Sequence, residues 1–233
     1  MSGLLRLATD LLYPMRCVGC SRFDAMLCEP CAATMEPATG AGRCRHCSAR
    51  WEGEDFCPRC FHLQEVAGVR AAFEMSGPAR QLVHNLKYRR YTSLAPLMAG
   101  YIRDPASQMP VEAWFAVPLH PSRERNRGFN QAEWLRRDSG LTPAGGQLLR
   151  VRKTTTQVGQ HLTERRQNVS GAFEYRGPSL EGAKIGLIDD VITSGATVNA
   201  CARDLKEAGA REVWAFAFAR ASYEPNTDAE IPD

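Results

Sequence analysis

The chain has 233 residues, 44% of them hydrophobic, enough to bury one full domain with a small appendage. No apolar run approaches the ~20 residues of a transmembrane helix, and the formal net charge is only +3. That charge is uneven, because residues 120–170 hold ten Arg or Lys against four acids, a balance of +6. Such a segment attracts polyanions, whether a diphosphate or a nucleic acid, although a solvated basic face explains it equally well.

Residues 3–13 predict a short amphipathic helix that ends at Pro14. Leucines recur along it, with Arg6 and Asp10 between them. A secretory signal would lack Asp10 and would carry a small-residue cleavage site after a longer apolar core. We therefore expect a cytoplasmic protein with no membrane span.

Eight of the nine cysteines lie within residues 17–60, in four Cys-x2-Cys pairs at 17/20, 28/31, 44/47 and 57/60. Each pair can direct two thiolates at one metal ion, and two pairs complete a closed tetrahedral sulfur site of the structural kind. Zinc is favoured over disulfides, which a reducing compartment disfavours, and over an iron–sulfur cluster. A sequential pairing is expected and an interleaved one is the alternative. The sequential ligand sets are Cys17, Cys20, Cys28 and Cys31 for one ion, and Cys44, Cys47, Cys57 and Cys60 for the other.

After residue 66 the sequence alternates between strand and helix patterns, which predicts an α/β domain with a mostly parallel sheet flanked by helices. The expected strands cover residues 69–75, 113–117, 185–188 and 213–219, and the expected helices begin at Pro78, Leu94, Phe129, Leu162 and Val198. The tail after Glu224 is acidic and predicts disorder. The expected domains are 14–62 for the cysteine module, 66–222 for the α/β domain and 223–233 for a flexible tail.

Two basic segments stand out in the α/β domain. Pro118 and Pro121 stiffen an expected loop after the strand 113–117, in which Arg123, Arg125 and Arg127 are spaced to converge. Ligands of α/β sheets bind beyond the carboxyl ends of the strands, and guanidinium groups bind a diphosphate bidentately.

The second basic segment, residues 150–157, holds Arg150, Arg152, Lys153 and Gln157 and predicts a mobile flap that keeps water from an activated sugar. An ordinary surface loop is the alternative reading of this segment.

The most informative stretch is a short apolar strand, the acids Asp189 and Asp190, a turn at 193–197 and a helix. A strand, a tight turn and a helix N-terminus form an anion site, because unpaired N–H groups and the helix dipole point at one spot. Gly195 lets the backbone approach a phosphate closely. The acids suit a sugar diol or a bound magnesium ion. Helix capping alone needs only one such side chain, so this stretch predicts a ribose 5-phosphate pocket.

Residues 185–197 resemble the phosphoribosyl pyrophosphate (PRPP) loop of type I phosphoribosyltransferases, with four hydrophobic residues, two acids and Thr-Ser-Gly-Ala-Thr. The resemblance implies that Asp189 and Asp190 bind the ribose 2- and 3-hydroxyls. It also implies that the 5-phosphate is wrapped by Thr193, Ser194, Gly195, Ala196 and Thr197.

The chain as a whole, roughly residues 13–220, resembles the ComF family, also called GntX-like, of competence-associated proteins. In that family a cysteine-knuckle module, here in the double zinc ribbon form, precedes a phosphoribosyltransferase domain. The matching positions are Leu86, Lys87, Tyr88, Pro118, Arg123, the run 127–131, Thr154, Gln157, Leu162, Arg165, Asn168, Ala172 and Phe173.

The resemblance implies a phosphoribosyl transfer in which a nitrogen nucleophile displaces pyrophosphate from C1 of PRPP, with magnesium on the diphosphate. Asp189 and Asp190 would fix the ribose, while Arg123, Arg127 and either Lys87 or Lys153 would hold pyrophosphate. A base, an amine or ammonia would each fit as acceptor. Two alternatives stay open: a PRPP-sensing protein without turnover, and a single-stranded-DNA-binding protein of the DNA-uptake machinery.

Overall fold

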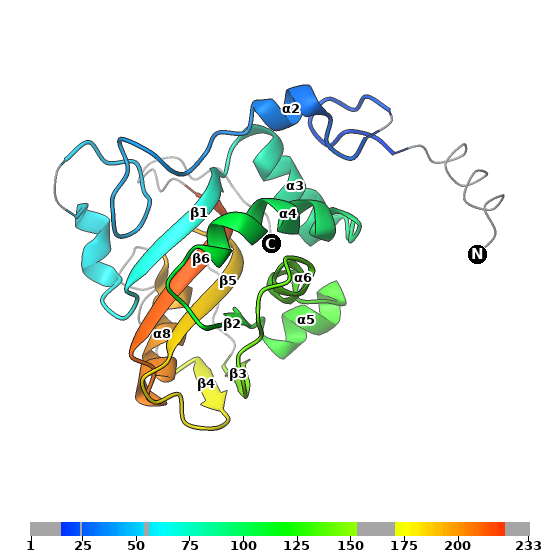
Figure 1. Ribbon diagram of the computed structural model, residues 1–233. Coiled ribbons are helices and arrows are strands. Elements are labelled where there is room, and N and C mark those ends of the chain that lie inside the picture. The colour runs from blue at the N-terminus through cyan, green and yellow to red at the C-terminus, as the bar shows by residue number, and fades with distance from the viewer. Residues whose placement is uncertain (1–14, 24, 54–55, 153–170, 222–233) are drawn as a thin grey trace.

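The computed structural model describes residues 15–23, 25–53, 56–152 and 171–221. Its centre is a four-stranded parallel sheet with the order β1-β6-β5-β2 (Figure 1). The strands are β1 (Gly68–Glu74), β2 (Ala113–Ala116), β5 (Lys184–Ile192) and β6 (Glu212–Arg220). The two central strands are apolar along most of their length because both of their faces are covered. The predicted α/β class with a parallel sheet is confirmed.

Helices cover both faces of this sheet (Figure 1). One face packs against α3, α4 and α6 through Ile188, Phe216 and Phe218, and the other packs against α8 through Leu187 and Ala215. The helices are α3 (Gly77–Tyr88), α4 (Leu94–Ser107), α6 (Gln131–Asp138) and α8 (Ala196–Glu207).

The prediction of a loop after β2 is wrong. Residues 121–127 form a helix, α5 (Pro121–Arg127), which begins at a proline and ends at Gly128 in the left-handed conformation. The His120 side chain accepts a hydrogen bond from the Ser122 N–H and caps it. On a helix, residues 123 and 127 share one side, whereas residue 125 lies on the other, so the expected convergence of three arginines is also wrong.

A second small sheet, which the sequence did not predict, pairs β3 (Gln147–Arg150) with β4 (Phe173–Arg176) in antiparallel fashion. It lies beside β2, where Tyr175 meets Phe115 edge-on at a centroid distance of 5.8 Å. Four expectations lie outside the described residues: the helix over 3–13, Lys153 with most of the flap, the helix over 162–168 and the tail.

The cysteine module is split between two places on the α/β domain (Figure 1). The first ribbon (residues 17–31) carries α2 (Glu29–Ala33) and packs against α3. The second ribbon (residues 44–60), which runs into the 3-10 helix η1 (Pro58–His62), packs between β1 and α8 and shares their core cluster. Backbone bonds join this part of the chain to β1, with the Val69 N–H donating to the His46 carbonyl at 2.7 Å.

The domain boundaries at 14–62, 66–222 and 223–233 stay predictions. No helix in the described ranges has the length and apolar character needed to span a bilayer.

Candidate functional site

The eight knuckle cysteines form two separate clusters. Within each cluster the four sulfur atoms lie within 4.8 Å of one another. The sets are Cys17, Cys20, Cys28 and Cys31 in the first ribbon and Cys44, Cys47, Cys57 and Cys60 in the second. The predicted sequential pairing is confirmed, and the interleaved alternative is not what the chain adopts.

The geometry of both clusters fits a tetrahedral zinc ion. Sulfur atoms in the second ribbon are 3.3–3.6 Å apart, close to the ~3.8 Å expected for Zn–S bonds of about 2.3 Å. The Cys28 N–H points at the Cys17 sulfur, and the Cys57 N–H points at the Cys44 sulfur, each at 3.4 Å. Such N–H groups stabilise thiolate charge, so the backbone is prepared for the ligand form of cysteine. The first cluster is partly exposed and the second is buried.

The phosphate loop (residues 193–197) joins β5 to α8 at the carboxyl edge of the sheet. Gly195 is the N-cap of α8 and has a φ of 78°. Because glycine has no side chain, the N-cap position itself provides no side-chain capping hydrogen bond. The Ser194 hydroxyl lies 3.4 Å from the Ala196 N–H. Thr193, Ser194 and Thr197 are all partly exposed, so their hydroxyls and the first helical N–H groups can reach an anion.

Asp189 and Asp190 lie inside β5, which extends four residues further than the expected strand. Successive side chains of a strand point to opposite faces. Asp189 therefore lies on the same face as Leu187, which packs against α8, and Asp190 lies on the opposite face with Ile188. Asp190 is buried, and its Oδ2 forms an ion pair with Lys87 Nζ at 2.8 Å. The two carboxylates therefore lie on opposite faces of the sheet and do not both face one sugar in this structure.

A polar chain links Asp190 to the end of α5. Asp190 Oδ1 accepts a hydrogen bond from the Val191 N–H at 2.9 Å and lies 3.5 Å from Gln131 Nε2. The Gln131 amide oxygen accepts a bond of 2.6 Å from Arg127, whose guanidinium lies 5.8 Å from the Tyr88 ring centroid. Asp190 therefore contacts Lys87 directly and is linked to Arg127 through Gln131.

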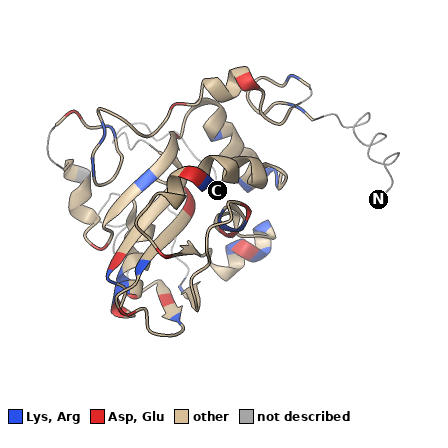
Figure 2. Ribbon diagram, viewed as in Figure 1, with Lys and Arg blue, Asp and Glu red and all other residues tan. Residues whose placement is uncertain are grey.

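The partly exposed Asp189 has different neighbours. Its Oδ1 accepts a 2.8 Å hydrogen bond from the Asp190 N–H. Desolvation of the Asp189 carboxyl, and then the charge of Asp190, raise its pKa well above the ordinary value. Arg150 lies within electrostatic range of Asp189 and Arg123, and burial followed by the Arg123 charge lowers the pKa of Arg150. Figure 2 shows that acidic residues are mixed among the basic ones of α5 and α6.

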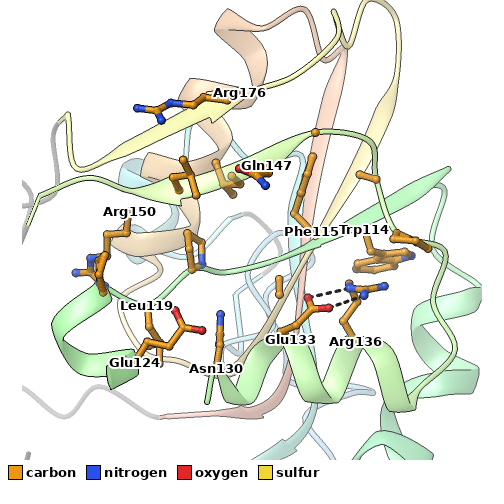
Figure 3. A pocket seen from close by; sticks show the side chains of 18 of the residues that line it. Trp114, Phe115, Leu119, Glu124, Asn130, Glu133, Arg136, Gln147, Arg150 and Arg176 are labelled. Atoms are coloured by element: carbon orange, nitrogen blue, oxygen red, sulfur yellow. Dashed lines mark hydrogen bonds and ion pairs between the residues drawn. The ribbon is translucent and has the colours of Figure 1, made fainter. Parts of the chain in front are cut away.

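An open cavity of about 760 Å³ adjoins this site (Figure 3). It lies between β2, the start of α5 and α6, and the β3 strand. Phe115, Pro118 and Leu119 give it an apolar side, and Asn130 and Arg150 give it polar groups. Glu133 and Arg136 line its other end as a two-point ion pair with a shortest N–O distance of 2.6 Å. The cavity is therefore large enough for a small planar molecule and offers it both apolar and polar contacts.

Most of the residues that the sequence singled out lie at this one edge of the sheet. Lys87, Arg127 and Asp190 are joined by the contacts above, whereas Arg123 lies on the Arg150 side, and Lys153 is outside the described residues. Sequence reasoning missed Gln131 as a site residue, although its place four residues after Arg127 was a signal.

Comparison with known proteins gives a consistent result. Residues 8–61 match the family model of the double zinc ribbon domain. The chain is 30% identical over 204 residues to the competence protein ComFC of Streptococcus pneumoniae, covering 84% of this chain and 89% of that protein. It is 28% identical to the DNA utilization protein YhgH of Salmonella typhimurium, covering 88% of each chain. It is 34% identical over 116 residues to the competence protein F of Haemophilus influenzae, covering 47% of this chain and 51% of that protein.

Proposed function

The chain belongs to the ComF family of competence proteins, and from that premise we propose that it binds PRPP and transfers its phosphoribosyl group in the service of DNA uptake or utilization. The observation that carries the proposal is the meeting of three groups at one sheet edge. These are an anion-binding loop, an acid pair and the basic residues Lys87 and Arg127. A structural helix cap would need none of the basic residues.

In this proposal the phosphate loop binds the 5-phosphate through N–H and hydroxyl donors. Asp189 and Asp190 accept hydrogen bonds from the ribose hydroxyls, once Lys87 turns from Asp190 to the diphosphate. Lys87, Arg123 and Arg127 hold the pyrophosphate, with Lys153 as a further candidate from the flap. Magnesium would arrive on the diphosphate, because this ion keeps several waters and binds through substrate phosphates with few protein ligands.

The reaction breaks the bond between ribose C1 and the pyrophosphate oxygen, and the electron pair leaves with pyrophosphate. A nitrogen of the acceptor forms the new bond to C1 and loses a proton. Lys87, Arg123 and Arg127 stabilise the charge that develops on the leaving group, and magnesium bound to the diphosphate would add to that effect. The cavity beside Asn130 and Arg150 is the candidate acceptor pocket, because Arg150, which lines it, lies within electrostatic range of Asp189. Its mixed lining suits a planar heterocycle better than ammonia.

Calorimetric titration of PRPP with magnesium into the zinc-loaded protein tests this proposal. We expect saturable binding that the double variant Asp189→Asn/Asp190→Asn weakens about 100-fold or more, since each hydrogen bond to a charged group is worth ~1.5–3 kcal/mol. Asp104→Asn, an exposed acid of α4, is the matched control and should bind as the wild type does. Equal PRPP affinity in the double variant would contradict the site assignment.

Single-stranded-DNA binding is a second candidate function, which the names of the relatives support. Phe56 and Phe61 on the second ribbon are 67% and 71% exposed, and exposed aromatic rings can stack on unpaired bases. DNA titrated in parallel at several salt concentrations separates the two functions. Binding of DNA with a steep salt dependence, but not of PRPP, would assign the chain to nucleic-acid handling.

A further inference from the structure

We propose that the second ribbon is a positioning element of the phosphate loop, and that Leu63 and Arg220 are the side chains that transmit its position. The inference rests on the proposed function, because it concerns the loop that would bind the 5-phosphate. Three sets of contacts surround the loop, two from residues 63–65, which directly follow the ribbon, and one from Arg220 of β6.

The first contact lies at the turn that opens α8. Leu63 directly follows η1 and is only 1% exposed. A Cβ atom built on Gly195 would lie 2.6 Å from Leu63 Cδ2, so the leucine occupies the space that a side chain at 195 would need. Gly195 also has a φ of 78°. Leu63 therefore packs directly against the one residue whose backbone sets the direction of the helical N–H groups.

The second set of contacts ties the same segment to the body of α8. The Glu65 N–H donates to the Asn199 side-chain oxygen at 2.9 Å. The Glu65 carboxylate lies 3.5 Å from Lys206 Nζ and 3.9 Å from Arg203 Nε. These contacts extend from the first turn of α8 to its last, so the segment after the ribbon is attached along the length of the helix.

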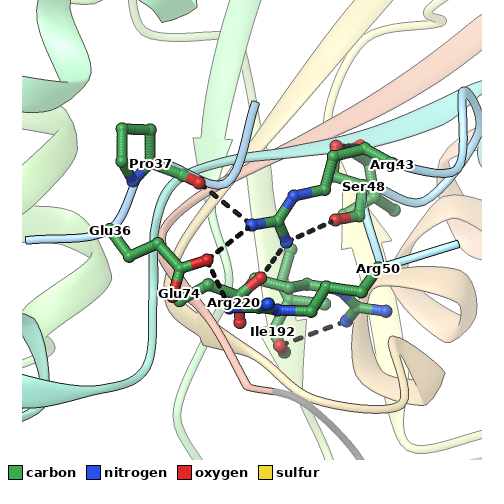
Figure 4. Close-up of polar contacts among 9 residues, drawn as sticks. Glu36, Pro37, Arg43, Ser48, Arg50, Glu74, Ile192 and Arg220 are labelled. Carbon is green, nitrogen blue, oxygen red and sulfur yellow. Dashed lines mark hydrogen bonds and ion pairs between the residues drawn. The ribbon is translucent and has the colours of Figure 1, made fainter. Parts of the chain in front are cut away.

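The third contact holds the other end of the loop (Figure 4). Arg220, at the end of β6 and 3% exposed, donates through Nη1 to the carbonyl of Ile192 at 3.1 Å and to the carbonyl of Thr193. Arg220 pairs in register with Glu74 of β1, a buried carboxylate that forms an ion pair with Arg43. Arg43 precedes the first cysteine of the second ribbon and also donates to the Pro37 carbonyl at 3.0 Å.

A purely structural role would also use such contacts, so the test must separate loop position from stability. The two ends of PRPP allow this separation. Ribose 5-phosphate probes the phosphate loop, while inorganic pyrophosphate probes the basic residues Lys87, Arg123 and Arg127. A change in loop position alters binding of the first probe and leaves binding of the second, whereas partial unfolding weakens both.

The experiment measures both affinities by calorimetry for the wild type, Leu63→Ala, Leu63→Met and Arg220→Lys, all zinc-loaded and well below their melting temperatures. Leu94→Ala is the control, since Leu94 is also 1% exposed but belongs to the core cluster on the other face of the sheet. We expect Leu63→Ala to weaken ribose 5-phosphate binding about tenfold, as the loss of one or two hydrogen bonds would. Leu63→Met should keep most of the ribose 5-phosphate affinity of the wild type. Arg220→Lys should lower that affinity as Leu63→Ala does, because lysine cannot donate to both carbonyls.

Pyrophosphate affinity should stay within about twofold of wild type in every variant. Unchanged ribose 5-phosphate binding in Leu63→Ala and Arg220→Lys overturns this inference and leaves the proposed function intact. Equal losses for both probes, or an equal loss in Leu94→Ala, also overturn it. A wild-type protein that binds neither probe overturns both proposals.

Discussion

The ion pair between Lys87 and Asp190 offers a direct test of how the site is stabilised. Asp190 is 2% exposed and Lys87 is 19% exposed, and their charged atoms lie 2.8 Å apart. Replacing Lys87 by Met leaves a buried carboxylate without its cation, a change that costs about 3–5 kcal/mol in other proteins. We expect the lower end, about 3 kcal/mol, because Asp190 keeps its hydrogen bond from the Val191 N–H and Lys87 is partly hydrated.

For a chain of this length, about 3 kcal/mol corresponds to a melting temperature lowered by roughly 10 °C. The assay is urea unfolding of the wild type, Lys87→Met, Asp190→Asn and the double variant, all zinc-loaded at pH 7. We expect the double variant to be more stable than the sum of the single effects implies, by about 2 kcal/mol, because Asn leaves no buried charge to compensate.

Lys184→Met is the control, since Lys184 pairs with Glu212 at 3.3 Å on the surface and should contribute less than about 0.5 kcal/mol. A stabilising ion pair between Lys87 and Asp190 is refuted if Lys87→Met lowers the free energy of unfolding no more than Lys184→Met does. It is also refuted if the losses of Lys87→Met and Asp190→Asn simply add in the double variant.

Two further predictions concern the ribbons and the loop. The first cysteine cluster is partly exposed and the second is buried, so a chromogenic chelator should remove one zinc ion per chain quickly and the second only as the protein unfolds; simultaneous release of both would contradict the difference in burial. Gly195→Ala should destabilise the protein by about 1–3 kcal/mol more than Gly182→Ala, because both glycines have φ near 75–78° but only Gly195 faces Leu63. Equal losses in urea unfolding would show that Leu63 moves aside without cost.

Local signals in the sequence predicted the central part of the site. The apolar run that ends at Ile188 marks a buried strand and Gly195 marks the turn, so β5, the loop and α8 follow from neighbouring residues, although β5 continues through the two acids to Ile192. The spacing of the cysteines likewise determines the two metal clusters, because each knuckle closes within a few residues.

Sequence analysis missed the features that no local sequence pattern marks. Helix α5 has a proline start and a glycine end, but none of its residues is buried, so no apolar periodicity marks it as a helix. The β3–β4 pair joins strands of four residues that are separated by 22 residues of sequence, so no short hairpin pattern marks them. Gln131, Leu63 and Arg220 gain their importance only from contacts across the fold, which a sequence pattern does not encode.

The way the cysteine module meets β1 has a consequence for how the protein behaves when metal is scarce. β1 is the outermost strand of the parallel sheet, and the chain on its open side supplies partners to Val69, Ala72 and Glu74. An uncovered strand edge is a template for pairing with other chains. Of these contacts, the bond from the Val69 N–H to the His46 carbonyl belongs to the second ribbon, so a metal-free ribbon would uncover that part of the edge, and zinc limitation should favour self-association before loss of the α/β core. The ribbon next to β1 therefore covers part of a strand edge that would otherwise be open to pairing with another chain.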